Sequence, residues 1–252
     1  MTADDTTSGE IHTTPDTHPP GTVALVGAGE YLPDMEPVDR ALLARLPTPP
    51  RVLVLPTAAA PDGPGVPERW ANMGVEHFTR LGAAVEPLML LTRADADRSD
   101  YARQIAAANF IYLSGGKPRY LLETLRDTNC WRAMRAVHAA GGVVAGCSAG
   151  AMALGGEVFD FPRPWPTLAG LGLVPGVLVI PHFDELPRYL SAALSAAPHR
   201  STVVGVDGMT ALLCSGGEGL VLGRGRVVVI AGRHRTEYRS GDRLPLPPAP
   251  SP

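Results

Sequence analysis

The sequence has little lysine, few cysteines and no long apolar segment. Lys117 is the only lysine among 22 basic residues, and the formal net charge of -3 gives no overall positive charge that would indicate binding to nucleic acid or to an anionic membrane. The three cysteines, Cys130, Cys147 and Cys214, are odd in number and widely spaced, which argues against a disulfide framework or a zinc site. We therefore expect reduced thiols and neither a metal nor a cofactor.

Targeting signals are also missing. No stretch of about 18 apolar residues occurs, so no transmembrane helix is expected. Residues 1–5 are acidic, whereas a secretory signal would begin with basic residues and continue with an apolar segment. These features predict a cytoplasmic protein.

The 252 residues are enough for one α/β domain. Residues 1–20, rich in Thr, Asp, Pro and Gly, and residues 241–252, rich in Pro, are expected to be disordered tails around a single domain of residues 21–240. Inside it, apolar segments of strand length alternate with amphipathic segments of helix length, which predicts a mainly parallel sheet covered by helices on both faces. The expected strands are 22–26, 51–55, 84–90, 110–113, 142–145 and 177–180.

The pattern changes near residue 202. Short apolar segments at 202–206, 210–214, 219–222 and 226–230 are separated by glycine-rich turns at 216–217 and 223–225. Turns of this composition are typical of hairpins. The sequence therefore predicts that the sheet ends in an antiparallel C-terminal meander.

The strongest chemical motif is Gly146-Cys147-Ser148-Ala149-Gly150, which follows an apolar strand and precedes helix-forming residues. This order is that of a nucleophile elbow, a sharp turn that presents a serine to its base. Glycines on both sides leave room for such a turn. The alternative is an ordinary β-to-α turn built from small residues, and Cys147 is interpreted as a packing residue.

A base for Ser148 must stand at the end of a neighbouring strand. His182 follows the apolar segment 177–180 and Pro181, at the strand end where open α/β sheets bind their ligands. We interpret His182 as the general base. The alternative is a loop histidine bonded to a backbone carbonyl.

Backbone N–H groups could stabilise the oxyanion of an acyl-transfer reaction. Ala149 directly follows the nucleophile and is one candidate. Gly115 and Gly116 are the others, because they end a second strand and precede a helix, where free N–H groups gather. A plain tight turn is the alternative for this glycine pair.

Several segments together resemble the cyanophycinase and dipeptidase E family of serine peptidases. They are the elbow, Ser114-Gly115-Gly116 before a helix, Pro181-His182-Phe183 followed by Arg188, residues 205–212, and residues 53–58. The resemblance covers residues 22–230 in the same order. It implies a three-layer αβα sandwich of the class I glutamine amidotransferase-like type, with serine at the position of the usual cysteine nucleophile, and it assigns Ser148 as nucleophile and His182 as base.

The third member of the triad departs from the family pattern. The family commonly has a glutamate where the ungapped match places Gly208, so the activity of the chain depends on whether another acid replaces it. Asp207, Asp160 and Asp184 are the candidates, and each could also be a solvated loop carboxylate. An orienting acid contributes strongly to catalysis by a serine–histidine pair.

The resemblance also implies a small peptide substrate with a peptide or isopeptide bond next to an aspartyl residue. Arg188 is the expected partner of the substrate carboxylate, because its guanidinium binds two oxygens at once. Lys117, which stands after the glycine pair, is a second substrate-binding candidate. A homodimer is a further expectation from the resemblance.

Two other hypotheses remain open. The chain could be a non-catalytic small-molecule binding or regulatory member of the same fold, which Gly208 in place of the acid supports. It could also be an α/β-hydrolase-type esterase, with His234 as the late histidine. The order of the segments argues against the esterase, because that class needs an acid between the serine and a histidine near the end of the chain.

Overall fold

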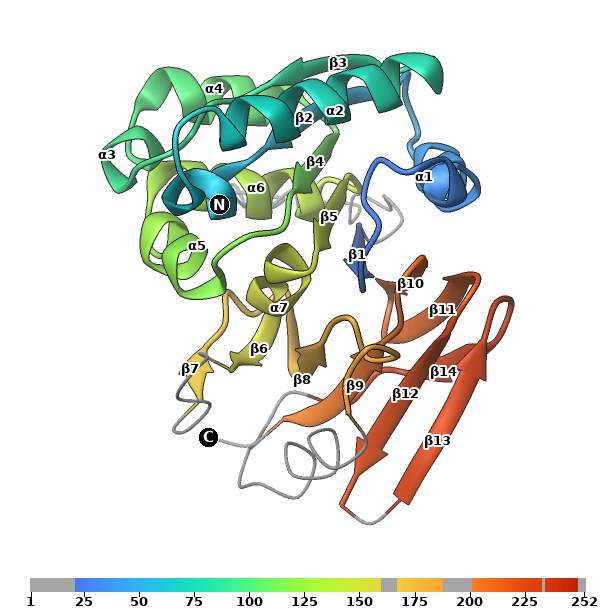
Figure 1. Ribbon diagram of the computed structural model, residues 1–252. Helices are drawn as coiled ribbons and strands as arrows, with labels where there is room; N and C mark the ends of the chain where they lie inside the picture. The colour runs from blue at the N-terminus through green and yellow to red at the C-terminus, as the bar shows by residue number, and fades with distance from the viewer. Residues whose placement is uncertain (1–20, 160–166, 188–200, 233, 249–252) are drawn as a thin grey trace, which may run out of the picture.

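The computed structural model describes residues 21–159, 167–187, 201–232 and 234–248, and it has a mixed α/β fold with two sheets (Figure 1). The eight-stranded sheet has the order β14-β11-β10-β1-β5-β4-β2-β3. Its members are β1 (Thr22–Val26), β2 (Arg51–Leu55), β3 (Ala84–Pro87), β4 (Phe110–Leu113), β5 (Val143–Cys147), β10 (Thr210–Ser215), β11 (Glu218–Gly223) and β14 (Arg243–Pro245). The five strands from β1 to β3 in this order are parallel, whereas β10, β11 and β14 run antiparallel to their neighbours.

The six-stranded sheet has the order β13-β12-β9-β8-β6-β7. Its members are β6 (Gly155–Val158), β7 (Leu168–Ala169), β8 (Val174–Ile180), β9 (Thr202–Val206), β12 (Arg226–Ala231) and β13 (His234–Arg239). Strand β8 is parallel to both β6 and β9, and the remaining pairs are antiparallel. The mainly parallel sheet with added antiparallel strands confirms the predicted fold class.

Helices lie on both faces of the eight-stranded sheet (Figure 1). They are η1 (Pro33–Met35), α1 (Glu36–Leu43), η2 (Thr57–Asp62), α2 (Val66–Arg80), α3 (Arg93–Ala96), α4 (Ser99–Ala107), α5 (Pro118–Leu125), α6 (Asn129–Ala139) and α7 (Ala149–Leu154). No helix among the described residues is long and apolar enough to cross a membrane.

Alternate residues of each parallel strand enter two separate cores. In β1, Ala24 and Val26 pack with residues of α1 and α2, whereas Val23 and Leu25 belong to the core of the opposite face, which continues into α4–α7 and the six-stranded sheet. Successive side chains of a strand point to opposite faces, so a strand covered on both sides must be apolar throughout. Burial on both faces of the sheet therefore explains the continuous apolar segments of the sequence.

The C-terminal strands are divided between the two sheets and do not form one continuous meander. Strands β10 and β11 form a hairpin around Gly216 and Gly217, as predicted, but β9 and β12 pair with each other in the six-stranded sheet. Residues 223–225 connect β11 of the eight-stranded sheet to β12 of the six-stranded sheet. A Cβ on Gly225 would lie 2.6 Å from the Asp207 Cβ, so this crossing needs a residue without a side chain.

The two predicted tails have different outcomes. Residues 1–20 lie outside the described part of the chain. The prediction that the chain is disordered from residue 241 onward is wrong for its first residues, because β14 pairs with β11 through Leu244 and Gly219, and Leu244 is buried in the core. Prolines are tolerated in a strand at the edge of a sheet, which explains how Pro245 can end β14.

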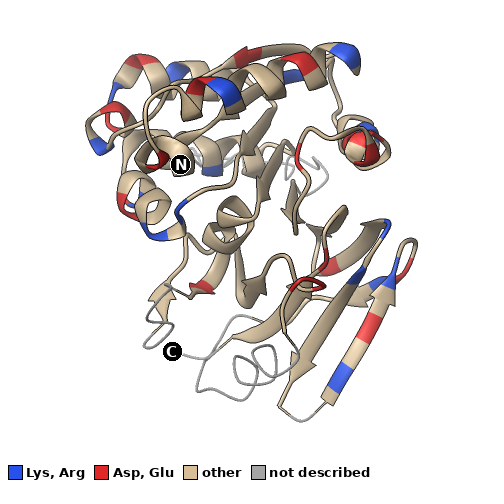
Figure 2. Cartoon of the chain, viewed as in Figure 1, with Lys and Arg blue, Asp and Glu red and all other residues tan. Residues whose placement is uncertain are grey.

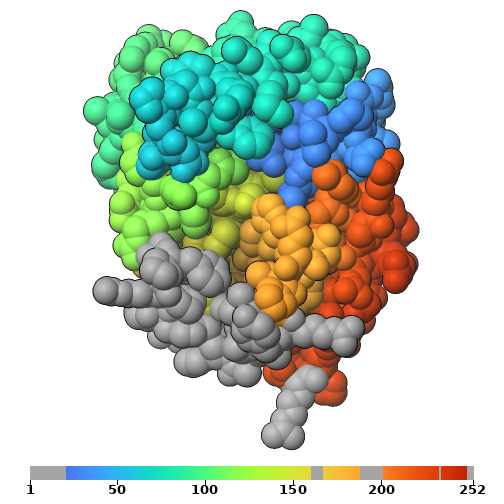
Figure 3. Space-filling model, in the orientation of Figure 1, coloured from blue at the N-terminus to red at the C-terminus, as the bar shows by residue number. Residues whose placement is uncertain are grey.

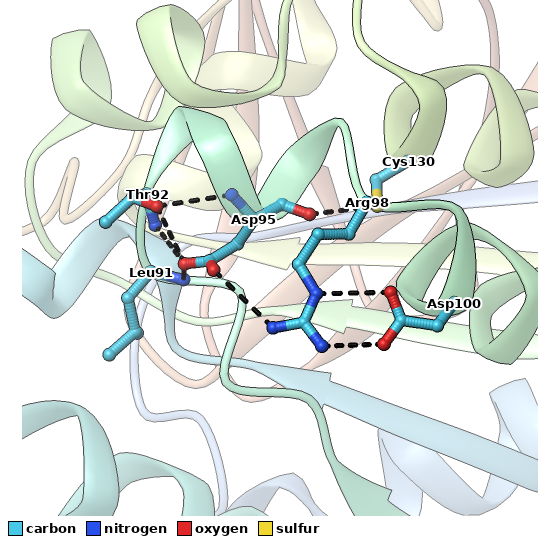
Figure 4. Close-up of polar contacts among 6 residues, drawn as sticks. All are labelled: Leu91, Thr92, Asp95, Arg98, Asp100 and Cys130. Carbon is cyan, nitrogen blue, oxygen red and sulfur yellow. Dashed lines mark hydrogen bonds and ion pairs between the residues drawn. The ribbon is translucent and has the colours of Figure 1, made fainter.

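Local polar contacts fix the start of α3 (Figure 4). The Thr92 hydroxyl accepts a hydrogen bond from the Asp95 N–H at 3.2 Å, and the Asp95 carboxylate accepts one from the Thr92 N–H at 2.8 Å. This reciprocal arrangement is a capping box, which satisfies donors that a helix leaves unpaired at its first turn. Arg98 then pairs with Asp100 at 2.6 Å, at the start of α4.

A buried histidine–aspartate pair joins α1 to α2. The Nε2 of His77 lies 2.8 Å from the Asp39 carboxylate, and both side chains are fully buried. Burial raises the pKa of Asp39, and the hydrogen bond from His77 lowers it. Among the described residues, the Asp39 carboxylate has no hydrogen-bond partner other than His77.

Replacing His77 by alanine should destabilise the protein by about 3–5 kcal/mol, because removing one partner leaves a buried carboxylate uncompensated. Chemical denaturation measures the free energy of unfolding. Arg40→Ala, which removes an exposed ion pair with Glu36 at 3.8 Å, is the control and should cost less than about 0.5 kcal/mol. Equal losses in the two variants would contradict the assignment.

Candidate active site

Ser148 occupies a strained turn between β5 and α7. Its backbone has φ 50° and ψ -110°, a conformation that L-residues rarely adopt and that surrounding packing must maintain. A Cβ on Gly146 would lie 2.4 Å from the carbonyl carbon of Gly150, and one on Gly150 would lie 2.4 Å from the Leu113 carbonyl oxygen. Strand, turn and helix thus meet too closely for any other residue at these two positions, as the elbow motif predicts.

His182 faces the serine from the six-stranded sheet. It follows β8 and Pro181, and its Nε2 lies 3.2 Å from the Ser148 Oγ. Its backbone also has a positive φ of 51°, which turns the chain at the end of the strand. The His182 side chain is 40% exposed, so it is partly open to solvent while its Nε2 contacts the serine.

The carboxylate beside His182 belongs to Glu185, which the sequence analysis did not select. The Glu185 N–H donates to the His182 carbonyl oxygen at 3.0 Å, closing a turn that brings the two side chains together. One Glu185 oxygen then lies 3.4 Å from the His182 Nδ1, and its side chain is 67% exposed. An acidic residue three positions after the histidine was the available signal, but the sequence alone does not show the turn that brings Glu185, and not Asp184, beside His182.

The acids selected from the sequence have other contacts. The Asp184 carboxylate accepts a hydrogen bond from the Gly208 N–H at 2.7 Å. The Asp207 carboxylate accepts one from the Arg226 N–H at 3.1 Å and forms an ion pair with its guanidinium at 3.3 Å. Burial raises the pKa of Asp207, whereas the Arg226 N–H lowers it. Among the described residues, neither acid forms a hydrogen bond or ion pair with His182. Asp160 lies outside these residues.

The Asp184 carboxylate lies in front of Gly208, the position where the resemblance predicts a glutamate. A Cβ on Gly208 would lie 3.6 and 3.7 Å from the two Asp184 carboxylate oxygens. Asp184 therefore fills the space in front of Gly208, and a second carboxylate at that position would meet like charge.

One of the three proposed oxyanion donors is already engaged. The Gly115 N–H donates to the Glu30 carboxylate at 3.0 Å, so our expectation of a free donor at Gly115 is wrong. The N–H groups of Gly116 and Ala149 have no hydrogen-bond acceptor among the described residues. Ala149 is the first residue of α7, where N–H groups have no earlier turn to bond to.

Glu30 is a second acid that the sequence analysis missed. It follows β1, is 7% exposed, and its other carboxylate oxygen accepts a hydrogen bond from the Cys147 thiol at 2.8 Å. Burial raises the pKa of the Cys147 thiol well above its ordinary value, and the Glu30 carboxylate raises it further. Cys147 is therefore a buried thiol that packs beneath the elbow, as expected from the sequence.

Of the two substrate-binding candidates, Lys117 and Arg188, Lys117 lies within the described part of the chain. The Lys117 Nζ lies 3.3 Å from an Asp62 carboxylate oxygen, and its side chain is 62% exposed. Arg188 lies outside the described residues. Charged residues are concentrated on the outer helices and on β13 (Figure 2), whereas the surface over β5 and α7, yellow in Figure 3, is recessed between α5 and the segment after β8.

An α/β fold with a serine on a strained elbow, and a histidine within hydrogen-bond distance of it, is the arrangement typical of serine hydrolases. Comparison with known proteins is more specific. A model of peptidase family S51 matches residues 23–222, and the chain belongs to this family of serine peptidases.

Curated relatives and solved structures agree with this assignment. The chain is 32% identical over 183 residues to a cyanophycinase of Synechococcus elongatus, an alignment that covers 68% of this chain and 56% of the relative. It is 33% identical over 185 residues to a cyanophycinase of Trichormus variabilis, covering 67% and 62%. The alignments thus span less than two thirds of these relatives' length.

Two solved structures share the fold. A peptidase from an acI-B1 Actinobacterium has a TM-score of 0.83 and 33% identity, covering 90% of this chain and 98% of that one. A putative peptidase E protein from Listeria monocytogenes has a TM-score of 0.62 and 19% identity, covering 81% and 99%. At that identity, the second structure supports the fold alone.

Backbone strain at Ser148 gives a stability prediction. Ser148→Gly should be more stable than Ser148→Ala by about 1 kcal/mol, because glycine relieves a strain of about 1–3 kcal/mol and costs roughly 0.5–1 kcal/mol of chain entropy. Thermal unfolding should show a Tm about 2–4 °C higher for the glycine variant. At Ser99, which has helical geometry in α4, glycine should instead be the less stable of the two. The same order at both sites would contradict strain at Ser148.

Proposed function

We propose that this chain is a serine peptidase in which Ser148 is the nucleophile and His182 the general base. The observation that carries the proposal is the 3.2 Å contact between the Ser148 Oγ and the His182 Nε2, made at a strained elbow. A serine hydroxyl becomes a useful nucleophile only when a base can accept its proton.

The geometry suggests a route for the proton. A neutral His182 with its proton on Nδ1 directs that N–H towards Glu185 and leaves the Nε2 lone pair for the Ser148 hydroxyl. As the hydroxyl oxygen attacks the substrate carbonyl carbon, His182 takes the proton and later returns it to the leaving amine. Water then attacks the acyl-enzyme with His182 again acting as base.

The negative charge that develops on the carbonyl oxygen needs fixed donors. The N–H groups of Ala149 and Gly116 are the two that no described partner occupies. Backbone donors are held by the fold and need no reorganisation during the reaction. They complete a set of nucleophile, base, orienting acid and oxyanion donors.

The two alternative functions have less support. A non-catalytic binding protein of the same fold does not require a serine and a histidine within hydrogen-bond distance. An esterase that uses His234 would need that residue beside the serine, but His234 is exposed on β13 and pairs with Ala231. Membership of peptidase family S51 also favours a peptidase.

Labelling with a fluorophosphonate probe tests the nucleophile and its base. The wild-type protein should be modified once, on Ser148, and Ser148→Ala should not react. His182→Ala should react about 10³–10⁴-fold more slowly. Glu185→Gln should react roughly tenfold more slowly, less than a buried triad acid would cost, because solvent already screens this exposed carboxylate.

Two variants serve as controls for this experiment. His234→Ala and Glu123→Gln, which remove a surface histidine and a surface carboxylate, should react at the wild-type rate. Absence of labelling in the folded wild-type protein would favour the non-catalytic alternative. Loss of reactivity in His234→Ala together with full reactivity in His182→Ala would favour the esterase.

The proposed substrate is a small peptide with a peptide or isopeptide bond next to an aspartyl residue. This proposal is supported by the family and by its cyanophycinase relatives, together with the resemblance around Arg188. A guanidinium can bind both oxygens of an aspartyl carboxylate. Lys117 is a second candidate for this contact, and a homodimer remains part of the proposal.

Paired dipeptides test the substrate proposal. Hydrolysis of Asp-Leu should exceed hydrolysis of Asn-Leu by at least about tenfold, because a charge-assisted hydrogen bond contributes about 1.5–3 kcal/mol, and Arg188→Ala should remove this difference. Arg132→Ala, on the outer face of α6, is the control and should keep it. Equal wild-type rates on the two dipeptides would refute the aspartyl preference and leave the serine mechanism untouched.

A further inference from the structure

Glu30 connects the two segments that form the proposed reaction centre. One of its carboxylate oxygens accepts from the Gly115 N–H at 3.0 Å, and the other accepts from the Cys147 thiol at 2.8 Å. Gly115 precedes a proposed oxyanion donor, and Cys147 precedes the proposed nucleophile. The contacts span 85 and 117 residues of sequence.

The order of the strands explains how one side chain reaches both segments. In the sheet, β5 lies between β1 and β4, and the three strands are parallel. Their carboxyl ends therefore meet at one edge, where Glu30 leaves β1, Cys147 ends β5 and Gly115 follows β4. The carboxylate extends from β1 across the end of β5 to the turn after β4.

Little space separates these groups. A Cβ on Gly115 would lie 2.9 Å from the Glu30 Oε1 and 3.4 Å from the Ser148 Cβ. The turn after β4 thus packs against both Glu30 and the proposed nucleophile. Because the packing is close, a change in the position of Glu30 must also displace the turn.

The turn itself is held on both sides of Gly116. Glu30 holds the Gly115 N–H before it, and the Ala58 carbonyl oxygen accepts from the Lys117 N–H after it at 2.7 Å. Gly116 has φ 140°, and a Cβ there would lie 2.2 Å from the Ala58 carbonyl oxygen. The Gly116 N–H, which lies between these two hydrogen bonds, has no acceptor among the described residues.

We propose that Glu30 is a positioning residue that fixes the oxyanion site by tying the Gly115 turn to the elbow. The inference rests on the proposed serine mechanism and adds a residue outside its triad. The described hydrogen bonds of Glu30 go to the Gly115 N–H and the Cys147 thiol and not to the Ser148 hydroxyl. It holds the backbone so that the Gly116 and Ala149 N–H groups converge on one oxygen.

A carboxylate suits this role. A charged acceptor binds N–H donors more strongly than a neutral one, and the interaction is stronger still when buried. The two described donors to Glu30 are neutral, so its burial costs stability. Such costs are typical of residues placed for function.

Two variants at position 30 test the inference, with fluorophosphonate labelling and dipeptide hydrolysis as readouts. Glu30→Ala should lower kcat and the labelling rate about 10²-fold, as for loss of an oxyanion donor, while KM changes less than about threefold. Glu30→Gln keeps an acceptor oxygen for the Gly115 N–H and should recover to within about fivefold of wild type. Glu123→Gln, at an exposed carboxylate on α5, is the control and should match wild type.

The outcomes separate this inference from the proposed function. A wild-type protein that does not label refutes the serine mechanism and the inference with it. A labelled wild type together with a Glu30→Ala variant of equal kcat, or one altered only in KM, overturns the inference alone. If Glu30→Ala fails to fold, Glu30→Gln and Cys147→Ala decide: Cys147→Ala should cost less than about tenfold, and a Glu30→Gln variant as inactive as His182→Ala overturns the assignment.

Discussion

The candidate active site lies at the carboxyl ends of β4, β5 and β1 and depends on the parallel pairing of these strands. Parallel neighbours end at the same edge of a sheet, so the residues that follow them must share the space beyond it. Here those residues are the Gly115 turn, Ser148 and Glu30. Each is supplied by a different part of the sequence, and only the hydrogen-bond ladder between the strands brings them together.

The same pairing maintains the strained backbone of Ser148. The Ser148 N–H donates to the Val26 carbonyl oxygen at 3.0 Å, so the elbow is attached to the end of β1 as well as to its own strand. Residues in unfavourable backbone conformations persist only where neighbouring structure determines them. The close contacts at Gly146 and Gly150 supply the rest of this support, and they explain why the turn is rich in small residues.

The sequence predicted the parts of the site that are local in the chain and missed those that depend on strand order or turn geometry. Ser148 and His182 stand out because a recognisable motif or an apolar strand precedes each of them. Glu30 makes its contacts with residues 85 and 117 positions away, and periodicity does not reveal which strands become neighbours. Glu185 depends on the positive φ of His182 and on the turn after it. The pairing of β12 with β9 in the six-stranded sheet and the pairing of β14 with β11 likewise depend on tertiary structure.

The proposed base and the proposed nucleophile belong to different sheets. Ser148 follows a strand of the eight-stranded sheet, whereas His182 and Glu185 follow β8 of the six-stranded sheet. Backbone contacts join these parts: the Phe183 N–H donates to the Val206 carbonyl oxygen, and the Met209 N–H donates to the Ala28 carbonyl oxygen, both at 3.1 Å. The segment between β9 and β10 therefore fixes the base relative to the end of β1. The Asp207 carboxylate accepts a hydrogen bond from the Arg226 N–H in this segment and so stabilises it. In the proposed mechanism, orientation of the His182 imidazole is therefore left to Glu185, which lies in the same turn.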